Sequence, residues 1–69
     1  MKYRVVIAWS AADKAYVAVV PDLPGCMAHG YTYEAALANV QDAAHLWLDS
    51  AREDGAPIPE PSDALLARA

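Results

Sequence analysis

The stretch TYEAALANVQDAAHLWLDSAREDG, residues 32–55, decides the fold because it predicts one long amphipathic helix. At 100° per residue its apolar side chains share one arc: Ala36, Leu37, Val40, Ala43, Ala44, Trp47, Leu48 and Ala51. The opposite arc is polar: Glu34, Gln41, Asp42, His45, Asp49, Arg52 and Glu53. Thr32 is a suitable N-cap, and Gly55 is suited to end the helix in the left-handed conformation. We therefore expect a helix from Tyr33 to about Asp54.

Upstream of the helix, three short segments have the composition of β-strands. Residues 2–9 alternate in the manner of a strand, residues 15–20 are rich in β-formers, and the polar residues 10–14 join them as a hairpin. The sequence PDLPG, residues 21–25, ends the second strand because proline lacks a donor for the sheet. Residues 26–31 form the third strand. The expected fold class is α+β, a three-stranded antiparallel sheet with one long helix in the order β-β-β-α.

Downstream of the helix, residues 56–61 read APIPEP and predict an extended proline-rich tail, since alternating prolines exclude a helix. Ser62 and Asp63 are placed to cap a last short helix over residues 64–69. Residues 1–62 therefore form one domain, and residues 63–69 form a short C-terminal tail.

The first two strands carry apolar side chains on both faces, although one helix covers only one face of a sheet. Val6 and Ala8 oppose Ile7 and Trp9 in the first strand. An uncovered apolar face is unusual for a monomer, so we expect a second chain to cover it, either another copy or a partner. The alternative is that the proline-rich tail folds back over it.

Composition limits the classes of function. Five Lys and Arg residues against nine Asp and Glu residues give a formal charge of −4, which argues against nucleic-acid binding and favours a basic partner. The lone Cys26 excludes an internal disulfide and is typical of a reducing compartment. No signal peptide and no apolar run long enough to span a membrane is expected, so we predict a cytoplasmic protein without membrane contact.

No constellation for catalysis or metal binding is expected. Cys26 and His29 lie an odd number of residues apart on a strand, so they face opposite sides of the sheet. Neither serine has the setting of an activated nucleophile, and the carboxylates do not converge. We therefore expect no enzyme, no cofactor and no metal. Leu46 stands at the margin of the polar arc and is either an ordinary exposed leucine or an anchor for another chain.

Three stretches stand out: YVAVVPDLPGC at residues 16–26, AHGYTYEAAL at residues 28–37, and GAPIPEPS at residues 55–62. With them the chain resembles the HicB antitoxin family, and the resemblance runs from about Lys2 to Ser62, nearly the whole chain. The motif residues are Tyr16, Pro21, Asp22, Leu23, Pro24, Gly25, Gly30, Thr32, Ala36 and Pro59. Apart from the resemblance, we expect most of them to build the fold: prolines and Gly25 shape the turn, Gly30 permits close packing, and Thr32 caps the helix.

The resemblance implies a partial RNase H-like fold and a role as an antitoxin. Members of this family neutralise HicA toxins, which are small, basic, RNA-cleaving proteins. Longer members carry a C-terminal DNA-binding domain, but only seven residues follow Ser62 here, so we expect no direct DNA binding.

Two functions remain open at this point. The first is an antitoxin-like protein that binds and neutralises a HicA-type toxin. The second is a stand-alone oligomeric module that binds a ligand or regulates, without a toxin partner. Both predict a homo-oligomer, a dimer or a tetramer. The candidate partner contacts lie on the polar side of the helix and are Asp42, Leu46, Asp49 and Glu53.

Overall fold

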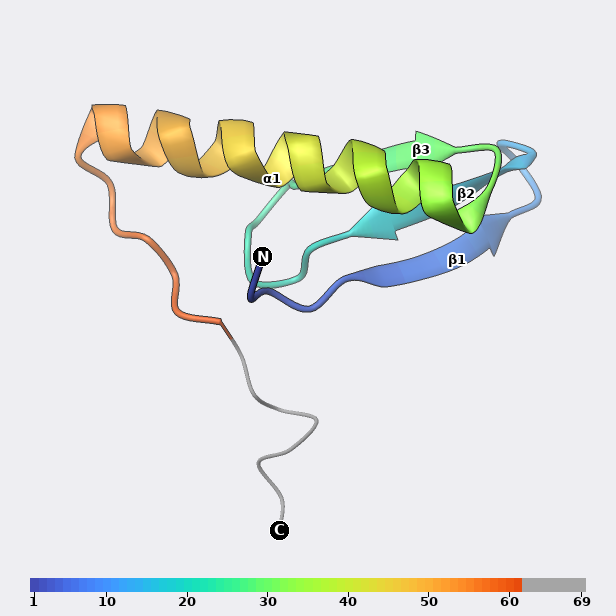
Figure 1. Cartoon of the computed structure of the whole chain (residues 1–69), viewed down its shortest axis with the longest axis horizontal. Helices are drawn as coiled ribbons and strands as arrows, with labels where there is room; N and C mark the ends of the chain where they lie inside the picture. The colour runs from blue at the N-terminus through green and yellow to red at the C-terminus, as the bar shows by residue number, and fades with distance from the viewer. Residues whose placement is uncertain (62–69) are drawn as a thin grey trace, which may run out of the picture.

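The computed structural model describes residues 1–61, which have the expected α+β fold. Strands β1 (Val6–Ser10), β2 (Ala15–Val19) and β3 (Met27–Gly30) precede the helix α1 (Tyr33–Asp54). The strands form an antiparallel sheet in the order β1-β2-β3, and α1 lies across one face of it (Figure 1). The short helix expected over residues 64–69 lies outside the described part of the chain.

Helix α1 begins and ends where the sequence predicts, because both ends are capped. Thr32 has an extended backbone, and its hydroxyl oxygen accepts a hydrogen bond from the Ala35 N–H at 3.0 Å. Gly55 has φ of 70°, and its N–H reaches the carbonyls of Ala51 and Arg52. Such a left-handed glycine satisfies carbonyls that the last turn leaves without intrahelical partners.

The strand boundaries differ from the prediction, most at β1. We expected a first strand over residues 2–9, but β1 begins only at Val6 and includes Ser10. Val6 pairs with Val19, the last residue of β2, after which the chain leaves the sheet. The register with β2 stops at this pair, so residues 2–5 lie outside β1. β2 and β3 are also shorter than expected at their ends.

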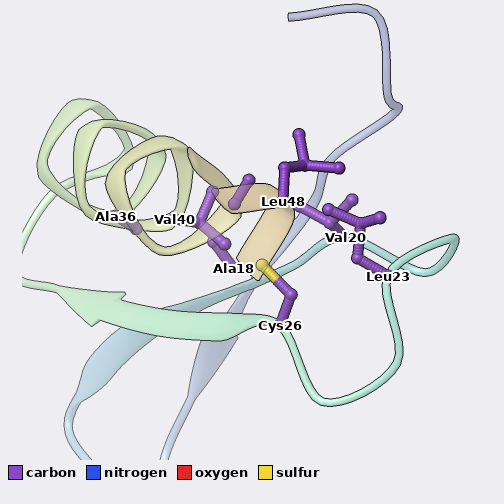
Figure 2. Close-up of a cluster of buried hydrophobic side chains, with 8 residues drawn as sticks. Ala18, Val20, Leu23, Cys26, Ala36, Val40 and Leu48 are labelled. Atoms are coloured by element: carbon purple, nitrogen blue, oxygen red, sulfur yellow. The ribbon is translucent and has the colours of Figure 1, made fainter. Parts of the chain in front are cut away.

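The core lies between α1 and the sheet face that it covers. Residues opposite each other in an antiparallel pair share a face, so Ile7, Ala18 and Ala28 point toward α1 together. Ala18 is fully buried against the helix. Figure 2 shows the buried cluster, which comprises Ala18, Val20, Leu23, Cys26, Ala36, Val40, Ala44 and Leu48.

The other side of the sheet, here called the open sheet face, has no cover in the described structure. It includes two rows of the register, Val6, Val19 and Met27 and then Ala8, Val17 and His29. Val6 is 49% exposed and Met27 is 52% exposed. The tail does not cover them within residues 56–61, where the Tyr3 hydroxyl donates to the Pro59 carbonyl at 2.5 Å. This matches the expected uncovered apolar face.

Candidate functional site

The loop of residues 20–26 places a leucine in the core. The Leu23 N–H donates to the Val20 carbonyl, and the Cys26 N–H donates to the Leu23 carbonyl, both at 3.0 Å. Gly25 adopts φ of 79°, a left-handed conformation in which glycine carries no steric penalty. Leu23 has no exposed surface. The PDLPG motif thus closes one end of the core with the Leu23 side chain.

Gly30 lies where α1 comes closest to the sheet. A Cβ atom added there would lie within 3.0 Å of the backbone nitrogen and Cα of Ala36. Ala36 itself is fully buried. Both motif residues are therefore small because two backbones meet there.

The remaining motif residues also contact the protein's own chain. The Tyr16 ring lies edge-on to Trp9, with centroids 5.2 Å apart, and 4.4 Å from the ring of Tyr33. Thr32 caps α1, and the carbonyls of Pro24 and Pro59 accept hydrogen bonds. Pro21 is exposed and Asp22 is half-buried. These placements fit structural roles. A partner surface is therefore expected elsewhere on the molecule.

Helix α1 carries the whole net charge of the chain. Its acidic residues are Glu34, Asp42, Asp49, Glu53 and Asp54, and its basic residue is Arg52. This is a formal charge of −4, equal to that of all 69 residues. The rest of the sequence therefore holds four charges of each sign, which cancel. Any attraction of this chain for a basic protein is concentrated on α1.

The four partner contacts predicted from the sequence come together as one surface strip of α1: Asp42, Leu46, Asp49 and Glu53. Their spacings of four, three and four residues place them on the same side of the helix. All four are exposed, and Leu46 is 70% exposed. We call the three carboxylates the acidic stripe. Within the stripe, Arg52 pairs with Asp49 at 2.9 Å, and in the described part of the chain neither Asp42 nor Glu53 has such an ion pair.

A groove runs alongside the acidic stripe, between the C-terminal half of α1 and the chain entering β3. This α1 groove has a volume of about 520 Å³. Its apolar lining comprises Cys26, Met27, Ala43, Leu46, Trp47 and Ala51. Asp54 also lines it. An apolar groove beside carboxylates resembles the anatomy of protein interfaces, in which an apolar centre has a polar rim.

Two side-chain hydrogen bonds fix the helix that forms one wall of the groove. The Trp47 indole N–H donates to the Pro24 carbonyl at 2.9 Å, which ties α1 to the PDLPG loop. The Asn39 amide donates to the His29 carbonyl at 2.7 Å, which ties α1 to β3. The groove is therefore held open by contacts of the fold itself.

Met27, Trp47 and Asp54 were not among the predicted partner contacts. The helical pattern places Trp47 on the buried arc, and its edge reaches the groove only because α1 is longer than the strands that it covers. A helix of 22 residues is about 33 Å long, whereas five strand residues span about 17 Å. Figure 1 shows the last turns of α1 extending past the strands. No signal in the sequence places Met27 beside them.

The chemistry-bearing residues do not converge. Cys26 is buried in the core, where burial raises the pKa of its thiol. His29 lies on the open sheet face, with its Nε2 3.6 Å from an Asp13 carboxylate oxygen. Among residues 1–61, no group of three or more His, Cys, Asp or Glu side chains is placed to hold a metal ion. In the same residues, no helix has the length and apolar character needed to cross a membrane.

Comparison with known proteins identifies the family. The chain is 39% identical over 59 residues to the UPF0150 protein Ta0767 of Thermoplasma acidophilum, covering 86% of this chain and 84% of that protein. It is 36% identical over 59 residues to the UPF0150 protein ssl0259 of Synechocystis, covering 86% and 80%. No solved structure gives a significant match, so the RNase H-like relation stays a prediction. The family described as "HicB_like antitoxin of bacterial toxin-antitoxin system" matches residues 3–67. The chain therefore belongs to the HicB-like antitoxin family.

Proposed function

We propose that the chain binds and neutralises a small, basic, RNA-cleaving toxin of the HicA type. Membership of the HicB-like antitoxin family supports this role. The observation that carries the proposal is the concentration of the net charge of −4 on α1. A protein that cleaves RNA needs lysine and arginine side chains to hold phosphates. An acidic helix competes with RNA for those side chains.

The electrostatic part of this binding acts mainly on encounter and orientation. Complementary charge raises association rates and excludes wrong partners, while apolar contacts supply much of the lasting affinity. The exposed carboxylates of α1 are screened by salt, with a Debye length of about 8 Å at physiological ionic strength. Inhibition of the toxin should therefore be slower to establish as salt rises.

We further propose that the chain forms a homo-oligomer through the open sheet face. The strands of this face carry no acidic residue, and α1 lies on the far side of the sheet. Two copies that pack these faces together keep their acidic helices apart. The Asp13 carboxylate, at the hairpin end of this face, already lies 3.6 Å from His29 Nε2, and a second copy brings matching apolar side chains. Both α1 helices then remain available to toxins.

We also infer a cytoplasmic location, without a direct role in DNA binding or catalysis. A toxin that cleaves messenger RNA has to be neutralised in the compartment where messenger RNA is found. The acidic surface of α1 repels a DNA backbone as it does any phosphate polymer.

Co-expression tests the proposal. The chain is produced from one promoter and the HicA-type protein encoded beside its gene from another, and growth and intact messenger RNA are followed. The chain should relieve growth arrest and preserve the RNA. If arrest persists while soluble chain is in excess, the antitoxin role is wrong. The stand-alone oligomeric module would then be the better description.

A further inference from the structure

The α1 groove has features that the general role of the acidic helix does not require. Leu46 is 70% exposed at the centre of the strip, with Asp42 and Glu53 one and two turns away. From Asp42 to Glu53 the strip runs about 16 Å along the helix axis. An exposed apolar residue flanked by carboxylates on a straight surface of this length matches about three turns of a second helix.

We propose that the α1 groove holds a basic amphipathic helix of the partner. An apolar side chain of that helix packs on Leu46 and Trp47, and its lysine or arginine side chains reach the acidic stripe and Asp54. This inference rests on the proposed function, since it names the part of the toxin that α1 holds. Helix-in-groove recognition of this kind uses apolar anchors three or four residues apart.

Other occupants fit the groove less well. A strand added to the edge of β3 would have to displace the hydrogen bond from the Asn39 amide to the His29 carbonyl. A second copy of this chain would bring another helix of charge −4 against the acidic stripe, and like charges facing each other are unfavourable. A positively charged helix has neither difficulty.

The end of α1 carries a charge arrangement that costs stability when no partner is bound. Glu53 and Asp54 lie in the last turn, where the helix dipole disfavours negative charge. Only Arg52 offsets them there. A cationic partner helix would remove this penalty, so binding and stability should respond in opposite directions to loss of the Glu53 charge.

A model peptide tests the groove without requiring any toxin. The probe is a synthetic helix of about 15 residues with leucines on one face and lysines on the other. The control peptide has the same composition in scrambled order. Titration into the ¹⁵N-labelled full chain, followed by NMR, should shift the resonances of residues 42–56 most. The scrambled peptide should bind at least about tenfold more weakly, because it cannot present one apolar face.

Matched variants separate the apolar contact from the charge. Leu46→Ala should weaken peptide binding about tenfold, whereas Tyr31→Ala, which also removes an exposed apolar side chain, should leave it unchanged. Glu53→Gln should weaken binding about two- to threefold, and Glu34→Gln in the first turn of the same helix should not. Each substituted residue is exposed, so the core is left intact.

Three results would overturn the inference. The first is equal binding of both peptides with shifts spread over Asp13, Asp22 and Glu34. The second is a shift pattern confined to the open sheet face. The third is movement of the groove resonances with the chain's own concentration, which would make a second copy the occupant. Failure of co-expression to relieve toxicity would instead count against the proposed function and leave the peptide result standing.

Discussion

Gly30 shows how one residue sets the spacing between the layers. Its missing side chain lets the backbone of α1 approach β3 at Ala36. Any larger residue would meet backbone atoms, which cannot rotate away as a side chain can. The sequence indicated close packing at this glycine, and the structure shows it.

Gly30→Ala should therefore lower the free energy of unfolding by roughly 3 kcal/mol, a large part of the stability of so small a domain. Gly55→Ala is the matched control. An added Cβ there meets nothing within 4 Å, and the residue costs only the strain of φ at 70°, about 1 kcal/mol. Urea unfolding followed by circular dichroism measures both. Equal losses would mean that the close approach to Ala36 is not what constrains Gly30.

Cys26 makes stability depend on pH. The thiol is 5% exposed, and burial raises its pKa in the folded chain. In the unfolded chain the thiol titrates at its ordinary value, about 8.5. As pH rises past that value, the unfolded state loses its proton first and is favoured. The contribution of the buried thiol is complete below the unfolded pKa and is lost as pH rises through the folded pKa.

The free energy of unfolding should thus fall more steeply above about pH 8.5 in the native chain than in Cys26→Ala. Urea titrations of both proteins from neutral to alkaline pH provide the comparison. Because tyrosines and lysines titrate in both, only the difference between the proteins reports on Cys26. Parallel curves would show that the thiol is solvated in the folded protein.

At the scale of the element, α1 combines the fold and the candidate site in one helix. One side supplies Ala36, Val40, Ala44 and Leu48 to the core, and another carries the acidic stripe. The N-terminal carboxylate Glu34 lies where the helix dipole favours it, and Glu53 lies where the dipole opposes it. The helix dipole therefore stabilises the carboxylate of Glu34 and destabilises that of Glu53.

Glu34→Gln should lower stability and Glu53→Gln should raise it, each by about 0.3–1 kcal/mol at low salt. Thermal unfolding in low and high salt measures the pair, and salt should shrink both effects. A loss of stability on Glu53→Gln would show that this carboxylate stabilises the isolated chain and would remove the argument that it is kept for a partner.

The bounds of α1 could be predicted because its signals are local. The period of its apolar residues, Thr32 at one end and Gly55 at the other all lie within the element. The start of β1 could not, since residues 2–5 alternate like a strand and only the register with β2, which stops at Val6 opposite Val19, excludes them. Strand limits depend on the neighbouring strand.

The candidate site could also be predicted only in part. Asp42, Leu46, Asp49 and Glu53 could be placed on one side of α1 from their spacing alone. Met27 and the edge of Trp47 could not, because they join the groove through the tertiary placement of the PDLPG loop and β3 against the helix. Their place in the groove therefore follows from the tertiary structure and not from the sequence pattern of α1.

At the scale of the whole molecule, the two surfaces lie on opposite sides of the sheet. The open sheet face is apolar, while α1 holds the net charge (Figure 1). A small domain with one uncovered sheet face buries less apolar surface than it would with a second subunit packed on that face. In the function proposed above, self-association uses the open sheet face and partner binding uses α1.

Light scattering at high concentration should therefore give a mass of at least twice that of one chain. Val6→Lys, at a residue 49% exposed on the open sheet face, should shift the population toward monomer by adding like charge where two copies meet. Leu46→Lys, on the helix side, should leave the mass unchanged. A monomer at every concentration would contradict the role of the open sheet face in self-association.

The most direct test of the antitoxin role is a titration of RNA cleavage. Purified HicA-type toxin is mixed with increasing amounts of the purified chain, and cleavage of a messenger RNA is measured at low salt. We predict that cleavage falls to zero when the chain equals the toxin in number, and that RNA and the chain exclude each other from the toxin. Undiminished cleavage in the presence of excess folded chain would contradict the account.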